Sequence, residues 1–292
     1  MKHCDRKGMT LIELIVALAI GVILLGAIYK VYTIQHRHYV TQTDISTMQQ
    51  EARLALLILS RDIRMAGFLC SPDDNLGIGG YSCGITAGNH NDAPDNITIV
   101  YAAKGGRITV QQVNGVTVTL SADPEDLVAP DNEGKKYVSF EGVKRAFEVE
   151  GHKGETLTLT EAPPAYIADY NAKFYGIRAI TYRVEGGVLI RDENTEDDEA
   201  RPVIGGKDFP IVEDLQFRYL VNGNWVHDPA GMEENIRAVE INLLVRTPKE
   251  DPQDRNYRRP PLGDRPGSDV LDGYKRRVFS TVVQLRNVGE AE

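Results

Sequence analysis

Several things are scarce in this 292-residue chain, and each scarcity excludes something. Proline is absent before Pro72, so nothing over that length forces a helix to break. A basic surplus is absent too: the formal net charge is -9, and we expect no nucleic-acid partner. There are only three cysteines, Cys4, Cys70 and Cys83, and the pair at 70 and 83 offers too few ligands for zinc.

Catalytic motifs are equally scarce. The sequence has no H-E-x-x-H pair, no G-x-S-x-G elbow and no Walker A loop, and its histidines are scattered. The glycines at 77–80 follow no strand pattern, so we interpret them as a loop. We therefore predict no catalytic residues, no metal and no cofactor. A triad can still be assembled from distant residues, so a membrane-tethered enzyme or binding protein stays open as another class.

What the chain does have is a strongly patterned N-terminus. Residues 1–8 hold three basic side chains against one acidic side chain, directly before an apolar run. Such a head is typical of a sorting signal whose positive charge stays in the cytoplasm. Residues 9–29 are long enough, at about 1.5 Å per helical residue, to span roughly one bilayer core.

One residue interrupts the apolar run. Glu13 is its sole charge, and nothing basic follows before Lys30. A lone carboxylate in lipid costs a few kcal/mol, is functional by default and needs a partner. Cleavage after Gly8 would supply one, because the new amine of Met9 lies four residues before Glu13. Between two staggered helices, the amine of one could neutralise the carboxylate of its neighbour and fix their register.

These residues carry a family resemblance. The segment 8–14, GMTLIEL, resembles the type IV prepilin cleavage and methylation motif. The resemblance implies cleavage between Gly8 and Met9 by a prepilin peptidase, and N-methylation of Met9, where many pilins have Phe. It also implies that Glu13 is the membrane carboxylate that pairs with a neighbour. An ordinary signal peptide or signal anchor is the alternative, but no small-residue cleavage site follows the run.

The helical pattern continues beyond the membrane segment. Apolar residues recur at steps of three and four, which predicts one buried face: Ile45, Met48, Ala52, Ala55, Leu59, Ile63 and Ala66. Polar residues, Asp62 among them, are expected on the other faces, and Gly67 is expected to end the helix. We predict one helix over residues 9–66, with its first half in lipid and its second half against a head domain.

Residues 68–96 are rich in glycine, asparagine and aspartate, and we predict a loop there. In an exported protein without its leader, Cys70 and Cys83 are most simply one disulfide, worth roughly 3 kcal/mol. Two buried thiols are the alternative.

Strand patterns follow, with hairpin turns at Asn114-Gly115 and Gly186-Gly187. The predicted strands are 97–101, 107–113, 116–120, 137–140, 146–149, 156–160, 180–184, 188–191, 215–221, 237–246 and 277–285. Residues 237–246 alternate as a half-buried strand does, with apolar side chains expected against the helix. Helix first and antiparallel strands afterwards predict an α+β, pilin-like fold, a long N-terminal helix packed on an antiparallel sheet domain.

Further segments sharpen the resemblance. Residues 51–56 and 60–68, and the late strands 236–246 and 277–287, resemble PilW-type minor pilins, with the J-type minor pseudopilin of type II secretion as the alternative. Residues 71–210 resemble no family. The implied partners are other pilins, the prepilin peptidase, the inner-membrane assembly platform and membrane lipid. The implied location is the inner membrane with a periplasmic head, and then the pilus at the cell surface.

The predicted domains are a cleaved leader at 1–8, a transmembrane half-helix at 9–30, an amphipathic half-helix at 31–67 and a head at 68–292. Three features of the head are interpreted structurally. The acidic run 192–199 is expected to be a solvated loop rather than a calcium site, and Trp225 is expected in the core with Tyr219. The proline-rich stretch 248–266, with Arg255, Arg258, Arg259 and Arg265, is expected to be a flexible, solvated loop.

Overall fold

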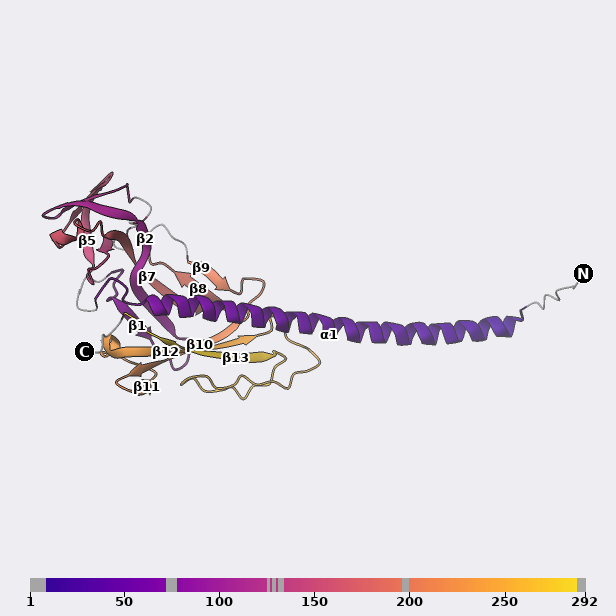
Figure 1. Cartoon of the computed structure of the whole chain (residues 1–292). Coiled ribbons are helices and arrows are strands. Elements are labelled where there is room, and N and C mark those ends of the chain that lie inside the picture. The colour runs from indigo at the N-terminus through magenta and orange to yellow at the C-terminus, as the bar shows by residue number, and fades with distance from the viewer. Residues whose placement is uncertain are drawn as a thin grey trace, which may run out of the picture. The chain divides into compact units, whose positions relative to one another are not determined.

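The computed structural model describes residues 9–71, 78–124, 127, 130, 134–195 and 200–287 (Figure 1). The predicted leader, including Gly8, lies outside the described residues. The chain divides into two compact units, Met1–Thr47 and Met48–Glu292. Both contain part of one helix, α1, which runs over Leu11–Met65 and has 55 residues. The helix ends where Gly67 adopts a positive φ of 71°, a conformation that glycine reaches without strain.

The first unit consists of the N-terminal part of α1. No described side chain in it is buried, and its apolar window is long enough to cross a membrane. The predicted end of the transmembrane half-helix, residue 30, lies directly after the stretch 14–29, which carries no charge. The compact head unit begins later in the helix, at Met48.

The second half of α1 has one buried face, as its spacing predicts. Met48, Ala52, Ala55, Leu59 and Ile63 are each at most 1% exposed. Asp62 is buried with them, at 7% exposure, although its polarity predicts an outer face. The intervening residues are mostly exposed or half-buried. Burial of this face anchors the helix in the head unit, since burying one aliphatic side chain stabilises by about 1.5–3 kcal/mol.

The larger sheet has nine antiparallel strands in the order β1-β2-β3-β6-β5-β4-β7-β8-β9. Because β2 also pairs with β7, the strands β2, β3, β6, β5, β4 and β7 form a closed ring of pairings. The strands are β1 (Gly84–Gly88), β2 (Asn96–Asn114), β3 (Thr117–Leu120), β4 (Lys136–Phe140), β5 (Phe147–Lys153), β6 (Thr156–Leu159), β7 (Lys173–Glu185), β8 (Val188–Asp192) and β9 (Arg201–Ile204).

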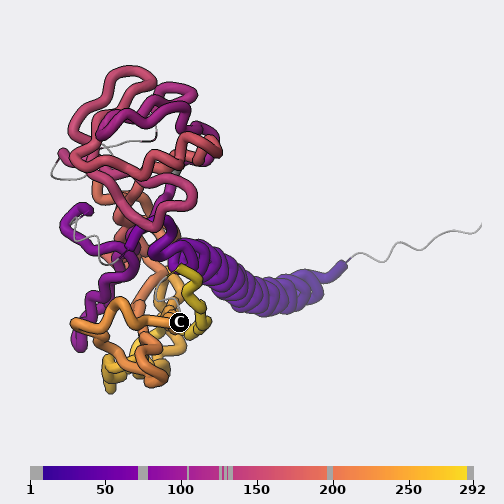
Figure 2. The backbone as a smooth tube through the Cα atoms, turned by 60° about the vertical axis from the view of Figure 1, so that its left-hand side comes forward, coloured from indigo at the N-terminus to yellow at the C-terminus, as the bar shows by residue number. Residues whose placement is uncertain are grey.

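The ring encloses its own apolar core, whose fully buried members include Val110, Val118, Val138, Phe140, Leu157 and Phe174. A short 3-10 helix, η2 (Ala165–Ile167), contributes Ile167 to that core. Figure 2 shows the ring at one end of the head unit and the smaller sheet, coloured orange to yellow, at the other.

The smaller sheet has four antiparallel strands in the order β11-β10-β12-β13. They are β10 (Val212–Val221), β11 (Asn224–Val226), β12 (Ile236–Arg246) and β13 (Arg276–Gln284), with a 3-10 turn, η3 (Glu233–Asn235), before β12. In β12 the alternating Val239, Ile241, Leu243 and Val245 are fully buried, as predicted. β13 is an edge strand, and it exposes Val278 and Val282 on its surface.

Both predicted hairpins are confirmed, between β2 and β3 and between β7 and β8. Three expectations were wrong. The predicted loop at 68–96 contains β1, and β7 begins at Lys173 rather than Ile180. The two strands expected at 97–101 and 107–113 are one strand, β2. The register of β2 against β7 shifts at Gly105, where the two strands pass closely. Only glycine fits there, because its φ is +146° and a Cβ would lie 2.2 Å from the Phe174 carbonyl oxygen.

Candidate functional site

The start of α1 is closed by a capping box that the sequence signal T-x-x-E could have revealed. Thr10 donates from its backbone N–H to Glu13 Oε2 at 2.8 Å and from its hydroxyl to the same oxygen at 2.9 Å. The Glu13 N–H points back to Thr10 Oγ1 at 3.4 Å. The Glu13 carboxylate therefore satisfies one backbone donor of the first turn, the Thr10 N–H, in addition to any role between chains.

The capping box uses only one of the two carboxylate oxygens of Glu13. In the described part of the chain, Oε1 makes no hydrogen bond, and the carboxylate has no ion-pair partner. Met9 lies just before the cap and is 73% exposed. The uncharged residues that follow are exposed as well. The first part of α1 is thus an exposed apolar helix with a single unneutralised carboxylate in its first turn.

Asp62, in the second half of α1, is the centre of a buried polar network. Its Oδ2 accepts a hydrogen bond of 2.6 Å from the Tyr182 hydroxyl and one of 3.2 Å from Arg191 Nε. Arg191 also pairs with Glu193 at 2.6 Å. Burial, with the Asp62 charge close by, raises the pKa of Tyr182, and the same two causes raise that of Tyr101. Both phenols therefore stay protonated, and β7 and β8 are held against the helix.

Further hydrogen bonds attach the helix to both sheets. Glu51 accepts from the Gly205 N–H at 3.0 Å, beside β9. The Gly67 N–H donates to the Val100 carbonyl of β2 at 3.0 Å. Beyond β13, Asn287 Nδ2 donates to the Arg64 carbonyl at 3.3 Å. The helix end is thus held by segments more than a hundred residues apart in the chain.

The structure differs from the disulfide prediction. It has Cys70 and Cys83 as two thiols, the alternative left open by the sequence. Both are buried in one apolar cluster, where the Cys70 thiol instead donates to the Val100 carbonyl at 3.7 Å. Their membership of one cluster leaves the oxidised pair a prediction for the exported protein.

The proline-rich stretch is attached to the head rather than flexible and solvated. Asp214, with no exposed side-chain surface, pairs with Arg259 and, at 3.3 Å, with Arg265. Arg259 also donates to the Pro266 carbonyl at 2.6 Å. The expectation of a solvated loop was wrong here because a buried carboxylate in β10 needs cationic partners, which the loop supplies. Arg255 and Arg258 do lie at the surface, each beside one carboxylate.

The carboxylate of Asp95 connects the larger sheet to the smaller one. Asp95, 2% exposed and next to β2, accepts from the Phe217 N–H of β10 at 2.9 Å and from the His90 N–H at 2.8 Å. Its own N–H donates to the Leu215 carbonyl at 2.8 Å. Burial raises the pKa of Asp95 to about 6, against the lowering effect of these N–H donors.

The structure also bears on the acidic run and on Trp225, whose expected place in the core was wrong. Tyr219 is buried, but Trp225 is 36% exposed on the short strand β11, with the Arg218 guanidinium 5.7 Å from its ring centre. In the acidic run, Asp192 pairs with Arg183 at 2.7 Å and Glu193 pairs with Arg191. Residues 196–199 of that run lie outside the described part.

Comparisons with known proteins match both ends of the chain. The prokaryotic N-terminal methylation motif matches residues 4–29, and the type IV pilus-assembly protein W family matches residues 178–287. No curated protein matches the chain. A type IV-like pilin from Thermus thermophilus is similar in structure, with 15% identity and a TM-score of 0.46, over 83% of this chain and 98% of that one.

The first match falls on the predicted prepilin motif. The second includes the late strands that resemble PilW-type pilins and begins earlier, at residue 178, within the stretch 71–210 for which no resemblance was expected. The first covers the capped, apolar start of α1, and the second runs from within β7 through β13 to the segment that follows. The J-type pseudopilin is not favoured by them. The chain carries a prepilin methylation motif and a region similar to the PilW family, which is consistent with a minor pilin.

Proposed function

We propose that this chain is a minor subunit of a type IV pilus that enters the filament, or primes its assembly, by its N-terminal helix. The observation that carries the proposal is the start of α1. An exposed apolar rod there bears one carboxylate with an unused oxygen, inside a matched prepilin motif. A structural subunit needs no catalytic group, so we assign none.

The first step is removal of the leader. Cleavage between Gly8 and Met9 by a prepilin peptidase leaves the Met9 amine as a new cation, which the methylation motif marks for N-methylation. Met9 then directly precedes the capping residue Thr10, so that the ammonium lies at the tip of α1. Before cleavage the chain stays in the inner membrane, with its head in the periplasm.

The second step is lateral docking. An ammonium and a carboxylate that both lie in lipid each cost a few kcal/mol, and pairing them between neighbouring subunits removes that penalty in one register only. Glu13 Oε2 is held by Thr10, which fixes the carboxylate and leaves Oε1 for the ammonium of the next chain. Apolar packing along 14–29 then holds the assembled helices. The partners are other pilins and the inner-membrane assembly platform.

The head explains why a minor rather than a shaft subunit is proposed. It combines a nine-stranded and a four-stranded sheet on the second half of α1, which is a large volume to repeat along a fibre. We place the subunit at low abundance in a pilus that reaches the cell surface. Quantitative mass spectrometry of sheared pili tests this point: finding this chain as the main component of the fibre would contradict it.

Intact-mass analysis of the protein purified from membranes tests the processing step. The expected mass lacks residues 1–8 and carries one methyl group. A control culture without prepilin peptidase should yield the uncleaved mass. Retention of the leader in peptidase-positive cells, with normal entry into pili, would contradict the mechanism.

A further inference from the structure

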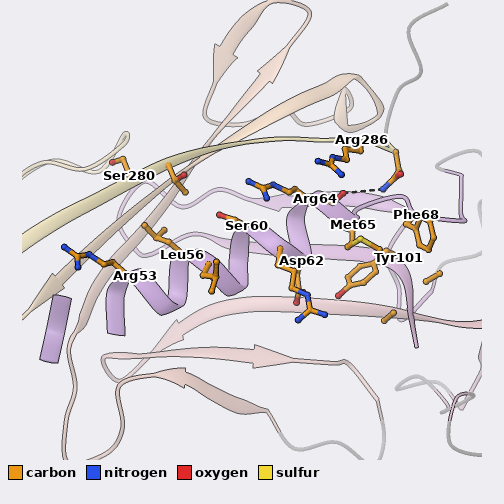
Figure 3. Close-up of a pocket in the computed structure, with 16 residues that line it drawn as sticks. Arg53, Leu56, Ser60, Asp62, Arg64, Met65, Phe68, Tyr101, Ser280 and Arg286 are labelled. Atoms are coloured by element: carbon orange, nitrogen blue, oxygen red, sulfur yellow. Dashed lines mark hydrogen bonds between the residues drawn. The ribbon is translucent and has the colours of Figure 1, made fainter. Parts of the chain in front are cut away.

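A groove in the head unit lies between the outer surface of α1 and the edge strand β13. It encloses about 820 Å³ and is open to solvent. Four arginines line it: Arg53, Arg61 and Arg64 from α1, and Arg286 from the segment after β13. Figure 3 shows Arg64 and Arg286 next to one another, with Met65 and Phe68 beside them. The groove is therefore both basic and partly apolar.

The four arginines are exposed and unneutralised. In the described part of the chain none of them has an ion-pair partner. Arginines elsewhere in the head, such as Arg183, Arg191 and Arg276, do pair with carboxylates. The one carboxylate at the groove, Asp62, is already bonded to Tyr182 and Arg191. A chain with net charge -9 thus gathers four exposed arginines along one groove.

The floor and the far wall supply two further kinds of contact. Leu56, Leu57, Met65 and Phe68 form an apolar surface, and Leu57 is 68% exposed. Ser280 and Thr281 belong to β13, the last strand of the sheet, whose outer edge pairs with no described strand. An edge strand offers backbone donors and acceptors to an extended chain.

We propose that this groove binds an extended, acidic segment of a partner protein. Its carboxylates would pair with the four arginines, whose planar guanidinium groups bind carboxylates through two parallel hydrogen bonds. Its apolar side chains would pack on Leu57, Met65 and Phe68, and its backbone would run along β13. The proposal concerns the head alone and is independent of leader cleavage and of Glu13.

The partner is assigned to another protein rather than to a second copy of this chain. The described acidic residues of the strongest candidate segment, Asp192 and Glu193, already pair with Arg183 and Arg191. An extended peptide also matches both the open edge of β13 and the apolar residues of the groove, whereas a lone anionic group would match only the arginines.

Binding of labelled peptides to the full chain in detergent tests the proposal. The probe is a short peptide in which Glu alternates with Leu, and its control has Gln in place of Glu. We expect the Glu peptide to bind and the Gln peptide to bind at least about tenfold more weakly, since glutamine cannot form ion pairs with the four arginines. Raising the ionic strength from roughly 0.05 M to 0.5 M should weaken the binding.

Charge reversal locates the site. The double variant Arg64→Glu/Arg286→Glu should bind the Glu peptide more than tenfold more weakly than wild type. Arg107→Glu, at an exposed arginine of β2 outside the groove, should leave this affinity unchanged. Unfolding curves that coincide with wild type show that the variants fold.

Three results would overturn the proposal. Equal binding of the two peptides would remove the charge complementarity, and equal binding by the double variant would place the site elsewhere. The third result would be a different occupant. Either only a water-soluble phosphatidylglycerol binds through these arginines, or the wild-type chain self-associates and the double variant does not. The occupant would then be a lipid or a second copy.

Discussion

Asp62 and Tyr182, 120 positions apart in the chain, share a buried hydrogen bond of 2.6 Å. The carboxylate comes from the buried face of α1, and the phenol comes from β7, which is fully buried at that point. Arg191 of β8 supplies the countercharge at 3.2 Å. The contact joins the helix to the larger sheet, so the position of α1 in the head depends on it.

Tyr182→Phe tests this connection. The change keeps the ring and leaves the buried Asp62 carboxylate with one donor fewer. We expect the free energy of unfolding to fall by about 1.5–3 kcal/mol, the range for a hydrogen bond to a charged group. Urea unfolding of the full chain in detergent measures it. Tyr166→Phe, at a half-exposed ring, is the matched control and should change stability little.

Asp214 is the second buried centre that can be tested. Asp214→Ala leaves Arg259 and Arg265 without their buried partner, and removal of one member of a buried pair costs about 3–5 kcal/mol. We expect trypsin to cleave the proline-rich stretch faster in this variant. Asp269→Ala removes a fully exposed carboxylate near Arg258 and should not change the cleavage rate. Equal rates in all three proteins would contradict the attachment of the stretch.

Asp95 predicts a specific pH dependence. Its pKa is about 6 in the folded chain and 3.8 in the reference state, so the folded state binds the proton more tightly. Between pH 4 and 6 its contribution to stability therefore falls as the pH rises, by on the order of 2–3 kcal/mol, and is flat above. The stability difference between wild type and Asp95→Asn should show this trend. A difference that is constant or rises with pH would contradict it.

We propose that Cys70 and Cys83 become oxidised in the exported protein. Mass analysis without reductant should then show neither thiol alkylated, and reduction should lower stability by roughly 3 kcal/mol, the value for a loop of this length. Cys83→Ser should lower stability to the same extent without reductant. Alkylation of both thiols in the exported protein, without added reductant, would contradict the pairing.

The sequence predicted what depends on local order. The period of Met48, Ala52, Ala55, Leu59 and Ile63 showed the buried helix face, and the two glycine-containing turns showed the hairpins, because each signal lies within a few residues. The prepilin motif is local in the same way. The helix period and the prepilin motif together were enough to place Met9 and Glu13 at the start of one long helix.

What the sequence could not show depends on long-range pairing. The ring closes because β2 meets β7 some seventy positions later, and no periodicity predicts which strands pair. Asp62, Asp95 and Asp214 are buried by partners 120, 122 and 45 positions away. Local spacing placed Asp62 among polar outer residues, and only its partners make burial tolerable.

The role of Glu13 is tested most directly by comparing two variants in cells that make pili. Glu13→Gln keeps an oxygen that can accept from Thr10, as glutamine does in a capping box, but it removes the charge. Thr10→Val removes the hydroxyl donor to Glu13 and keeps the charge. The two variants therefore separate helix capping from pairing with a neighbouring ammonium.

The measurement is the amount of each variant in sheared pili, relative to the amount cleaved in the membrane. We predict normal cleavage in both, near-normal incorporation of Thr10→Val, and at least a tenfold loss for Glu13→Gln, because an unpaired ammonium in lipid costs a few kcal/mol. Wild-type incorporation of Glu13→Gln would contradict the account.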